Sequence, residues 1–119
     1  IDGSDNFKTK FLINDFCVKF KKKLVTGAIS KFDGHVFTFD FNDKKTASLK
    51  SFYQENEISD NDLNCEFEGV LGTTASIVGT TQANEALKMI MKIGQTLKNQ
   101  ILIIDLLNLN FRKVKFNKK

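Results

Sequence analysis

The amino-acid sequence predicts one α/β domain over residues 1–119, in which two main helices pack on a mixed β-sheet. Three observations predict this class. Apolar residues recur at helical spacing from Phe7 to Phe20, and again from Thr73 to Ile93. Between these two segments, residues 36–41 alternate between phenylalanine and other side chains, which is typical of a strand. A chain of 119 residues has room for one hydrophobic core.

The first elements are a strand end, a turn and a helix. Residues 1–6 contain turn and cap formers, so a helix should begin at Phe7. No complete strand precedes this helix, and the fold is therefore expected to be incomplete. The residues expected on its buried face are Phe7, Phe11, Leu12, Phe16 and Phe20.

Two strands and a long loop follow. Leu24–Ile29 is short and apolar, as in a buried strand, and the turn at 32–35 joins it to the alternating strand Val36–Phe41. Residues 42–64 are polar and irregular, which predicts a long loop with a helical turn near 49–53. Long loops in compact domains are often functional or disordered.

The second helix is predicted over Thr73–Ile93, after a tight passage flanked by Gly69 and Gly72. Two buried strands should follow it, at residues 100–107 and 111–116. The residues expected on the inward face of the helix are Ala75, Gly79, Ala83, Ala86, Leu87, Ile90 and Met91.

Charge and composition argue against several classes of partner. The chain has 18 basic and 14 acidic residues, a net charge of +4, and a mild lysine excess attracts phosphates only weakly. Most aromatic residues lie at positions expected to be buried and do not form a stacking surface for bases, so nucleic-acid binding is not expected. The longest apolar run, residues 101–104, is far shorter than the roughly 20 residues of a membrane span. Two cysteines do not make a secreted scaffold, and a cytoplasmic setting is expected.

The pair Asp5-Asn6 is the first candidate for chemistry. It lies between a strand end and a helix, where ligands often bind in α/β sheets, and a carboxylate there could hold Mg²⁺ and the phosphates of a nucleotide. The alternative is that Asp5 or Asn6 caps the helix. His35, the only histidine, is expected to be structural, and Cys17 lies among apolar positions where packing is its expected role.

Cys65 is the second candidate, because a thiol next to a polar loop could act as a nucleophile. Glu66 and Glu68 would raise the pKa of its thiol, which favours the alternative of an incidental cysteine. The sequence has no phosphate-binding loop of the Gly-x-Gly-x-x-Gly or Walker type. It has no Cys-x-x-Cys pair either, so zinc is not expected.

Taken together, these segments resemble the ThiF/MoeB/HesA proteins, the bacterial relatives of ubiquitin-activating enzymes. The Gly-x-x-Gln-Ala-x-Glu-Ala pattern within residues 79–86 is fairly specific to that family. The resemblance covers nearly the whole chain in order. It is carried by residues 2–10, 12–15, 23–28, 69–72, 79–88, 102–105 and 111–112.

The resemblance implies the C-terminal part of a Rossmann-like adenylyltransferase fold. Members of the family use ATP and Mg²⁺ to adenylate the C-terminal glycine of a ubiquitin-like sulfur-carrier protein, for molybdopterin or thiamin synthesis, and they form homodimers. By this resemblance Asp5 would serve the metal, and Asn6 and Lys10 the nucleotide, with Lys10 in place of the usual arginine. Cys65 falls on the loop cysteine that takes part in sulfur chemistry in some members.

The resemblance leaves two functional readings open. The glycine-rich nucleotide loop of the family lies upstream of the matched segments, so this chain alone is expected to be inactive. One reading is therefore part of an adenylyltransferase for a carrier protein, or for a peptide as in related members. The alternative is a non-catalytic module that serves in dimerisation or another interaction.

Overall fold

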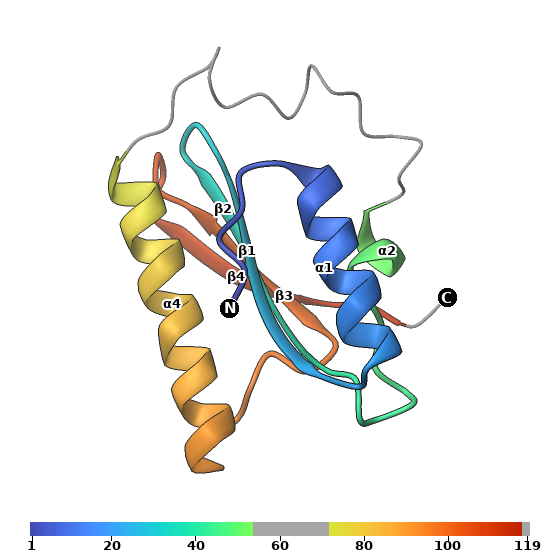
Figure 1. Ribbon diagram of the computed structural model, residues 1–119. Coiled ribbons are helices and arrows are strands. Elements are labelled where there is room, and N and C mark those ends of the chain that lie inside the picture. The colour runs from blue at the N-terminus through green and yellow to red at the C-terminus, as the bar shows by residue number, and fades with distance from the viewer. Residues whose placement is uncertain (54–71, 118–119) are drawn as a thin grey trace.

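The computed structural model describes residues 1–53 and 72–117 and shows three layers (Figure 1). A central sheet carries α1 and the short α2 on one face and the long α4 on the other. Within the described residues the sheet has four strands in the order β1-β2-β3-β4. The strands are β1 Lys23–Ser30, β2 Asp33–Asp40, β3 Gln100–Asp105 and β4 Asn110–Lys115.

All neighbouring strands pair antiparallel, from Lys23 opposite Asp40 at one end of the β1–β2 ladder to Ser30 opposite Asp33 at its turn. Parallel pairing occurs only in two isolated bridges of the described chain, Asp2 with Thr26 and Thr38 with Lys98. The α/β class and the two main helices are confirmed. The parallel part of the predicted mixed sheet is limited to these bridges.

The helices follow the predicted order with shifted ends. Helix α1 spans Phe7–Lys19 and α4 spans Gly72–Met91. Helix α2, Leu49–Phe52, lies inside the predicted 42–64 loop, where a helical turn was expected. Residues 54–64 of that loop lie outside the described part of the chain. Neither α1, α2 nor α4 is long and apolar enough to cross a membrane.

The alternation of β2 divides the core in two. Phe37, Phe39 and other residues of its face point toward α1 and α2, whereas Val36 points toward α4. The buried cluster under α1 and α2 consists of Phe11, Leu24, Phe37, Phe39, Phe41, Leu49 and Ile101. The buried cluster under α4 consists of Val25, Val36, Val78, Leu97 and Ile104.

The predicted buried face of α1 is wrong over most of its length. Phe11 is buried and Phe7 is half-buried, but the other three predicted positions are 52–56% exposed. The residues that turn inward with Phe11 are Lys10 and Asn14, because each finds a polar partner on another element. Asn14 Oδ1 accepts a hydrogen bond from the Leu49 backbone N–H at 3.1 Å, and this bond ties α1 to α2.

The predicted inward stripe of α4 is also wrong, since most of it faces outward. The buried residues are Thr74, Val78, Gln82 and Glu85, and of the predicted stripe only Ala86 is partly buried. The cause lies in the sheet, where glycine at position 27 leaves room for the Val78–Gln82 side of the helix. The exposed members of the predicted stripe are Ala75, Gly79, Ala83, Leu87, Ile90 and Met91.

The last strand was expected to be buried, but every residue of β4 is exposed. Among the described residues, strand β4 has a sheet neighbour on one side only, and α4 packs on β1 and β2 at the opposite side of the sheet. Its side chains therefore have little to pack against. Three cations, Arg112, Lys113 and Lys115, lie along this edge, and charged side chains on an edge strand discourage pairing with other chains.

Candidate functional site

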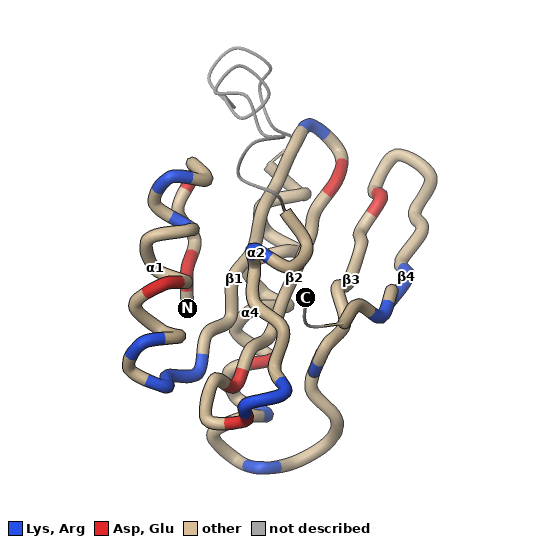
Figure 2. The backbone as a smooth tube through the Cα atoms, turned by 90° about the vertical axis from the view of Figure 1, so that its right-hand side faces the viewer, with Lys and Arg blue, Asp and Glu red and all other residues tan. Residues whose placement is uncertain are grey.

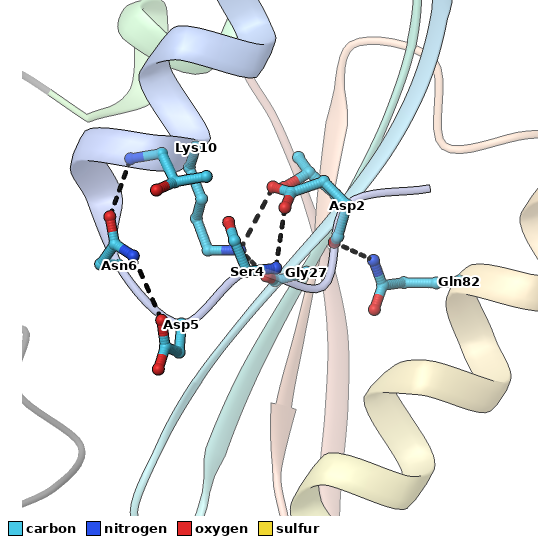
Figure 3. A network of polar contacts seen from close by, with 9 residues as sticks. Asp2, Ser4, Asp5, Asn6, Lys10, Gly27 and Gln82 are labelled. Atoms are coloured by element: carbon cyan, nitrogen blue, oxygen red, sulfur yellow. Dashed lines mark hydrogen bonds and ion pairs between the residues drawn. The ribbon is translucent and has the colours of Figure 1, made fainter.

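The turn of residues 3–6 carries the predicted Asp5-Asn6 pair into α1 (Figure 3). Asn6 is the N-cap, and its Oδ1 accepts a hydrogen bond from the Thr9 backbone N–H at 2.8 Å. Its side-chain Nδ2 donates to Asp5 Oδ1 at 3.1 Å. Asn6 thus performs the capping role, and the exposed carboxylate of Asp5 remains at the surface beside the helix N-terminus.

The N-terminal end of the turn is fixed to the free edge of β1 through the backbone of Asp2. The Asp2 N–H donates to the Val25 carbonyl at 2.8 Å, and the Gly27 N–H donates to the Asp2 carbonyl at 3.3 Å. Residue 2 therefore forms an isolated parallel bridge with Thr26, at the place where the end of a strand was predicted.

The carboxylate of Asp2 is the centre of a buried polar network. It is reached by the Thr26 hydroxyl at 2.6 Å, the Ser4 backbone N–H at 2.8 Å and the Lys10 ammonium at 3.3 Å. Burial by itself would raise the pKa of this carboxyl. The hydrogen bonds from Ser4 and Thr26 and the charge of Lys10 outweigh burial, so the pKa of Asp2 is lowered.

Lys10 crosses from α1 to the sheet and buries its ammonium there. Its Nζ pairs with Asp2 and also donates to the Gly27 carbonyl at 2.5 Å, and the side chain is 4% exposed. In this structure the ammonium of Lys10 points into the protein, away from the exposed Asp5 carboxylate (Figure 3). The expected contact of Lys10 with a nucleotide phosphate stays a prediction.

Helix α4 reaches the same network from the other face of the sheet. The Gln82 side-chain Nε2 donates to the Asp2 carbonyl at 2.7 Å, across 80 positions of sequence. Gly27 makes this approach possible, because a Cβ at that position would lie 2.6 Å from Gln82 Oε1. Sequence reasoning did not assign a role to Asp2 or Gln82; the signal that could have found Gln82 is the family-typical motif of residues 79–86.

Glu85 of the same motif is also buried, but its hydrogen bonds connect other elements. Its Oε2 accepts hydrogen bonds from the Thr38 hydroxyl and the Leu97 backbone N–H, both at 3.0 Å, and its Oε1 pairs with Lys88 at 2.5 Å. It therefore ties α4 to β2 and to the segment that leads into β3.

The other candidate residues have separate surroundings. Cys65 lies outside the described residues. Cys17 is half-buried in α1, where burial raises the pKa of its thiol, as fits a packing role. His35 hydrogen-bonds the Tyr53 hydroxyl through Nδ1 and packs edge-on against Phe52. Burial lowers the pKa of His35 and raises that of Tyr53, so neither group is charged near neutral pH.

Asp5 could hold a divalent cation as a single carboxylate. Among the described residues only Asn6 donates to it, and the structure there contains no group of three or more His, Cys, Asp or Glu side chains suited to a metal. Mg²⁺ typically takes one or two protein carboxylates and completes its shell with waters and phosphate oxygens. The exposed Asp5 fits that mode of binding and does not fit a closed protein cage.

Comparison with known proteins places the chain in a family. The sequence model of the family described as ThiF matches residues 1–119. The chain belongs to the ThiF family. A protein named "Probable molybdopterin-synthase adenylyltransferase" from Pyropia yezoensis is 39% identical over 116 residues, and the match covers 97% of this chain and 30% of that protein. The "Sulfur carrier protein adenylyltransferase" of Thermus thermophilus is 35% identical over 117 residues, which are 96% of this chain and 43% of that protein.

Solved structures agree on the fold of this ThiF-family chain. Escherichia coli MccB superposes with a TM-score of 0.75 at 11% identity, over 95% of this chain and 35% of the MccB chain. The chain thus spans less than half the length of these relatives and of this solved structure. The predicted resemblance to ThiF/MoeB-type proteins is confirmed.

Proposed function

We propose that this ThiF-family chain contributes the Asp5 side of a Mg·ATP site in an adenylyltransferase that activates a ubiquitin-like sulfur-carrier protein. The observation that carries the proposal is the exposed Asp5 carboxylate at the strand-to-helix turn, in a chain matched over residues 1–119 by the ThiF family. Relatives named as adenylyltransferases for molybdopterin synthase and for a sulfur carrier support the substrate class.

The proposed reaction joins the C-terminal carboxylate of the carrier to AMP. The carboxylate oxygen attacks the α-phosphorus of ATP, and the bond to the β-phosphate oxygen breaks with release of pyrophosphate. Bound Mg²⁺ offsets charge on the phosphates. In this scheme Asp5 would hold the cation. Asn6 caps the N-terminus of α1, and the buried Asp2–Lys10 ion pair anchors the start of the turn.

The proposal also covers the rest of the nucleotide site and the role of Cys65. The sequence contains no glycine-rich phosphate loop, so groups outside these 119 residues would hold most of the nucleotide. We therefore expect no adenylation by the chain alone. Cys65, by the family resemblance, would serve a later sulfur-transfer step, and a thiamin or a molybdopterin carrier would fit equally.

Calorimetry of Mg·ATP binding to the purified chain tests the proposal. The wild-type chain is expected to bind weakly, and Asp5→Ala should abolish the binding. Asp15→Ala is the matched control, because Asp15 is an exposed carboxylate of α1 that pairs with Lys50 instead. Equal binding by the wild type and Asp5→Ala, or none by the wild type, would contradict a preformed Asp5 site. Pyrophosphate exchange catalysed by the chain alone would contradict the expected inactivity.

A second candidate function is dimerisation, favoured by the outer face of α4. The only charged residues of this helix are Glu85 and Lys88, and they pair with each other. On the outer side, Leu87, Ile90 and Met91 are 54–76% exposed, and small residues precede them. An uncharged surface on a long helix is typical of one that is covered in the assembled protein. The occupant we propose is a second copy of the chain.

Sedimentation equilibrium tests this dimer. The wild type should sediment as a dimer, and Ile90→Glu should shift it to monomer. Val18→Glu is the control, since Val18 is also exposed and apolar but lies on α1, on the other face of the sheet. A wild-type chain that stays monomeric at high concentration would exclude the α4 dimer.

A further inference from the structure

The geometry of α4 points to Gln82 as a positioning residue for the Asp5 turn. This inference rests on the proposed function, because it assigns a role relative to the proposed metal-binding carboxylate. Gln82 lies on α4, is 4% exposed, and does not reach Asp5 itself. It acts through Asp2, whose carbonyl oxygen receives the Gln82 amide at 2.7 Å.

Asp2 is the point at which three elements meet. Its carbonyl accepts from Gly27 on β1 at 3.3 Å and from Gln82 on α4 at 2.7 Å. Its carboxylate accepts from Thr26 and pairs with Lys10 of α1. The Gln82 bond is the shorter of the two bonds to the carbonyl, so Gln82 limits the movement of residue 2 along the edge of β1.

Inside the turn between Asp2 and Asn6, the half-buried Ser4 donates its N–H to Asp2 Oδ1, so this bond also ends on residue 2. A Cβ at Gly3 would meet nothing within 4 Å, and Gly3 and Asp5 are exposed. The turn is therefore defined by its two ends, the anchored residue 2 and the Asn6 cap. With only three residues between these ends, a displacement of Asp2 must move the backbone that carries Asp5.

The sequence also reserves space for this contact. Glycine at position 27 is required where Gln82 packs, because an added Cβ would come within 2.7 Å of both the Gln82 Cδ and Val78 Cγ1. At this contact α4 packs on β1 and also holds the N-terminal turn, through Gly27, the Gln82 amide and the Asp2 carbonyl (Figure 3).

The test compares Gln82→Met with Val78→Ala by amide exchange. Gln82→Met keeps the side-chain length and removes the donor, whereas Val78→Ala weakens the same helix–sheet contact without touching Asp2. In Gln82→Met, the Ser4 amide, which donates to Asp2 Oδ1, should exchange roughly tenfold faster relative to the β2 amides. Val78→Ala should leave that ratio unchanged. A Ser4 rate that follows the β2 amides in both variants would overturn the positioning role.

A second readout concerns the metal. Mn²⁺ titrated into the isotope-labelled chain should broaden the NMR resonance of Asp5. Gln82→Met should weaken Mn²⁺ binding by about tenfold, which is typical when a residue that supports a metal ligand is mutated. Val78→Ala should not weaken it. Absence of broadening in the wild type would contradict the proposed metal site, whereas the Ser4 exchange ratio still decides the role of Gln82. If Gln82→Met does not fold, Gln82→Leu gives the same comparison, since a leucine side chain has no group that can donate to the Asp2 carbonyl.

Discussion

Replacing Lys10 by methionine is expected to lower the free energy of unfolding by about 3 kcal/mol. The side chains of the Lys10–Asp2 pair are 4% and 2% exposed, so the substitution leaves a buried carboxylate without its cation. Removing one partner of a buried pair typically costs about 3–5 kcal/mol. The lower end applies here because Thr26 and Ser4 still donate to Asp2.

Urea denaturation at pH 7 measures this loss, with Lys50→Met as the matched control. Lys50 pairs with Asp15 at 3.1 Å, but these side chains are 40% and 52% exposed, so the control should lose less than about 1 kcal/mol. The slope of the free energy against urea should stay the same in both variants. If Lys10→Met is no less stable than Lys50→Met, the buried pair does not anchor the turn.

Three further predictions concern stability. Because the pKa of Asp2 is lowered in the fold, its ionised form stabilises the protein at pH values above the ordinary carboxyl pKa of 3.8. This stabilisation is lost as the pH falls below that value. The urea midpoints at pH 7 and at pH 3 should therefore differ less in Asp2→Asn than in the wild type. Gly27→Ala should cost about 1–3 kcal/mol in urea denaturation, because its Cβ would lie 2.6 Å from Gln82 Oε1, whereas Gly3→Ala, with open space around it, should change little. Leu109 has a φ of +51°, so Leu109→Asn should stabilise the β3–β4 hairpin by up to about 1 kcal/mol and raise the melting temperature; a lower melting temperature would contradict a strained Leu109.

The order and type of the elements could be predicted from the sequence because they depend on local patterns. Alternation in residues 36–41 and helical spacing after Phe7 and after Thr73 are properties of neighbouring positions. The Asn6 cap is local too, since it joins residues three positions apart. Figure 2 shows basic residues in the segment that joins α1 to β1, where the sequence has a run of lysines at 21–23.

The buried faces of the helices could not be predicted in the same way. Both helices carry apolar residues on two sides, and the side that packs is chosen by partners far away in sequence. Lys10 is buried because Asp2 and the Gly27 carbonyl receive it, and Gln82 because Gly27 leaves it room. A rule that places apolar residues inside and polar residues outside therefore selects the wrong sides of α1 and α4.

In the N-terminal turn, the residues that stabilise the structure are different from the residue proposed to bind the metal, Asp5. The groups that hold the turn are Asp2, Lys10 and Gln82, and all of them are buried and bonded within the protein. The helix cap is Asn6, whose loss would cost about 1 kcal/mol. Asp5 itself is exposed and, among the described residues, bonds only to the Asn6 amide. Substituting Asp5 should therefore leave the fold intact, so any loss of Mg·ATP binding in Asp5→Ala reports on the missing carboxylate and not on unfolding.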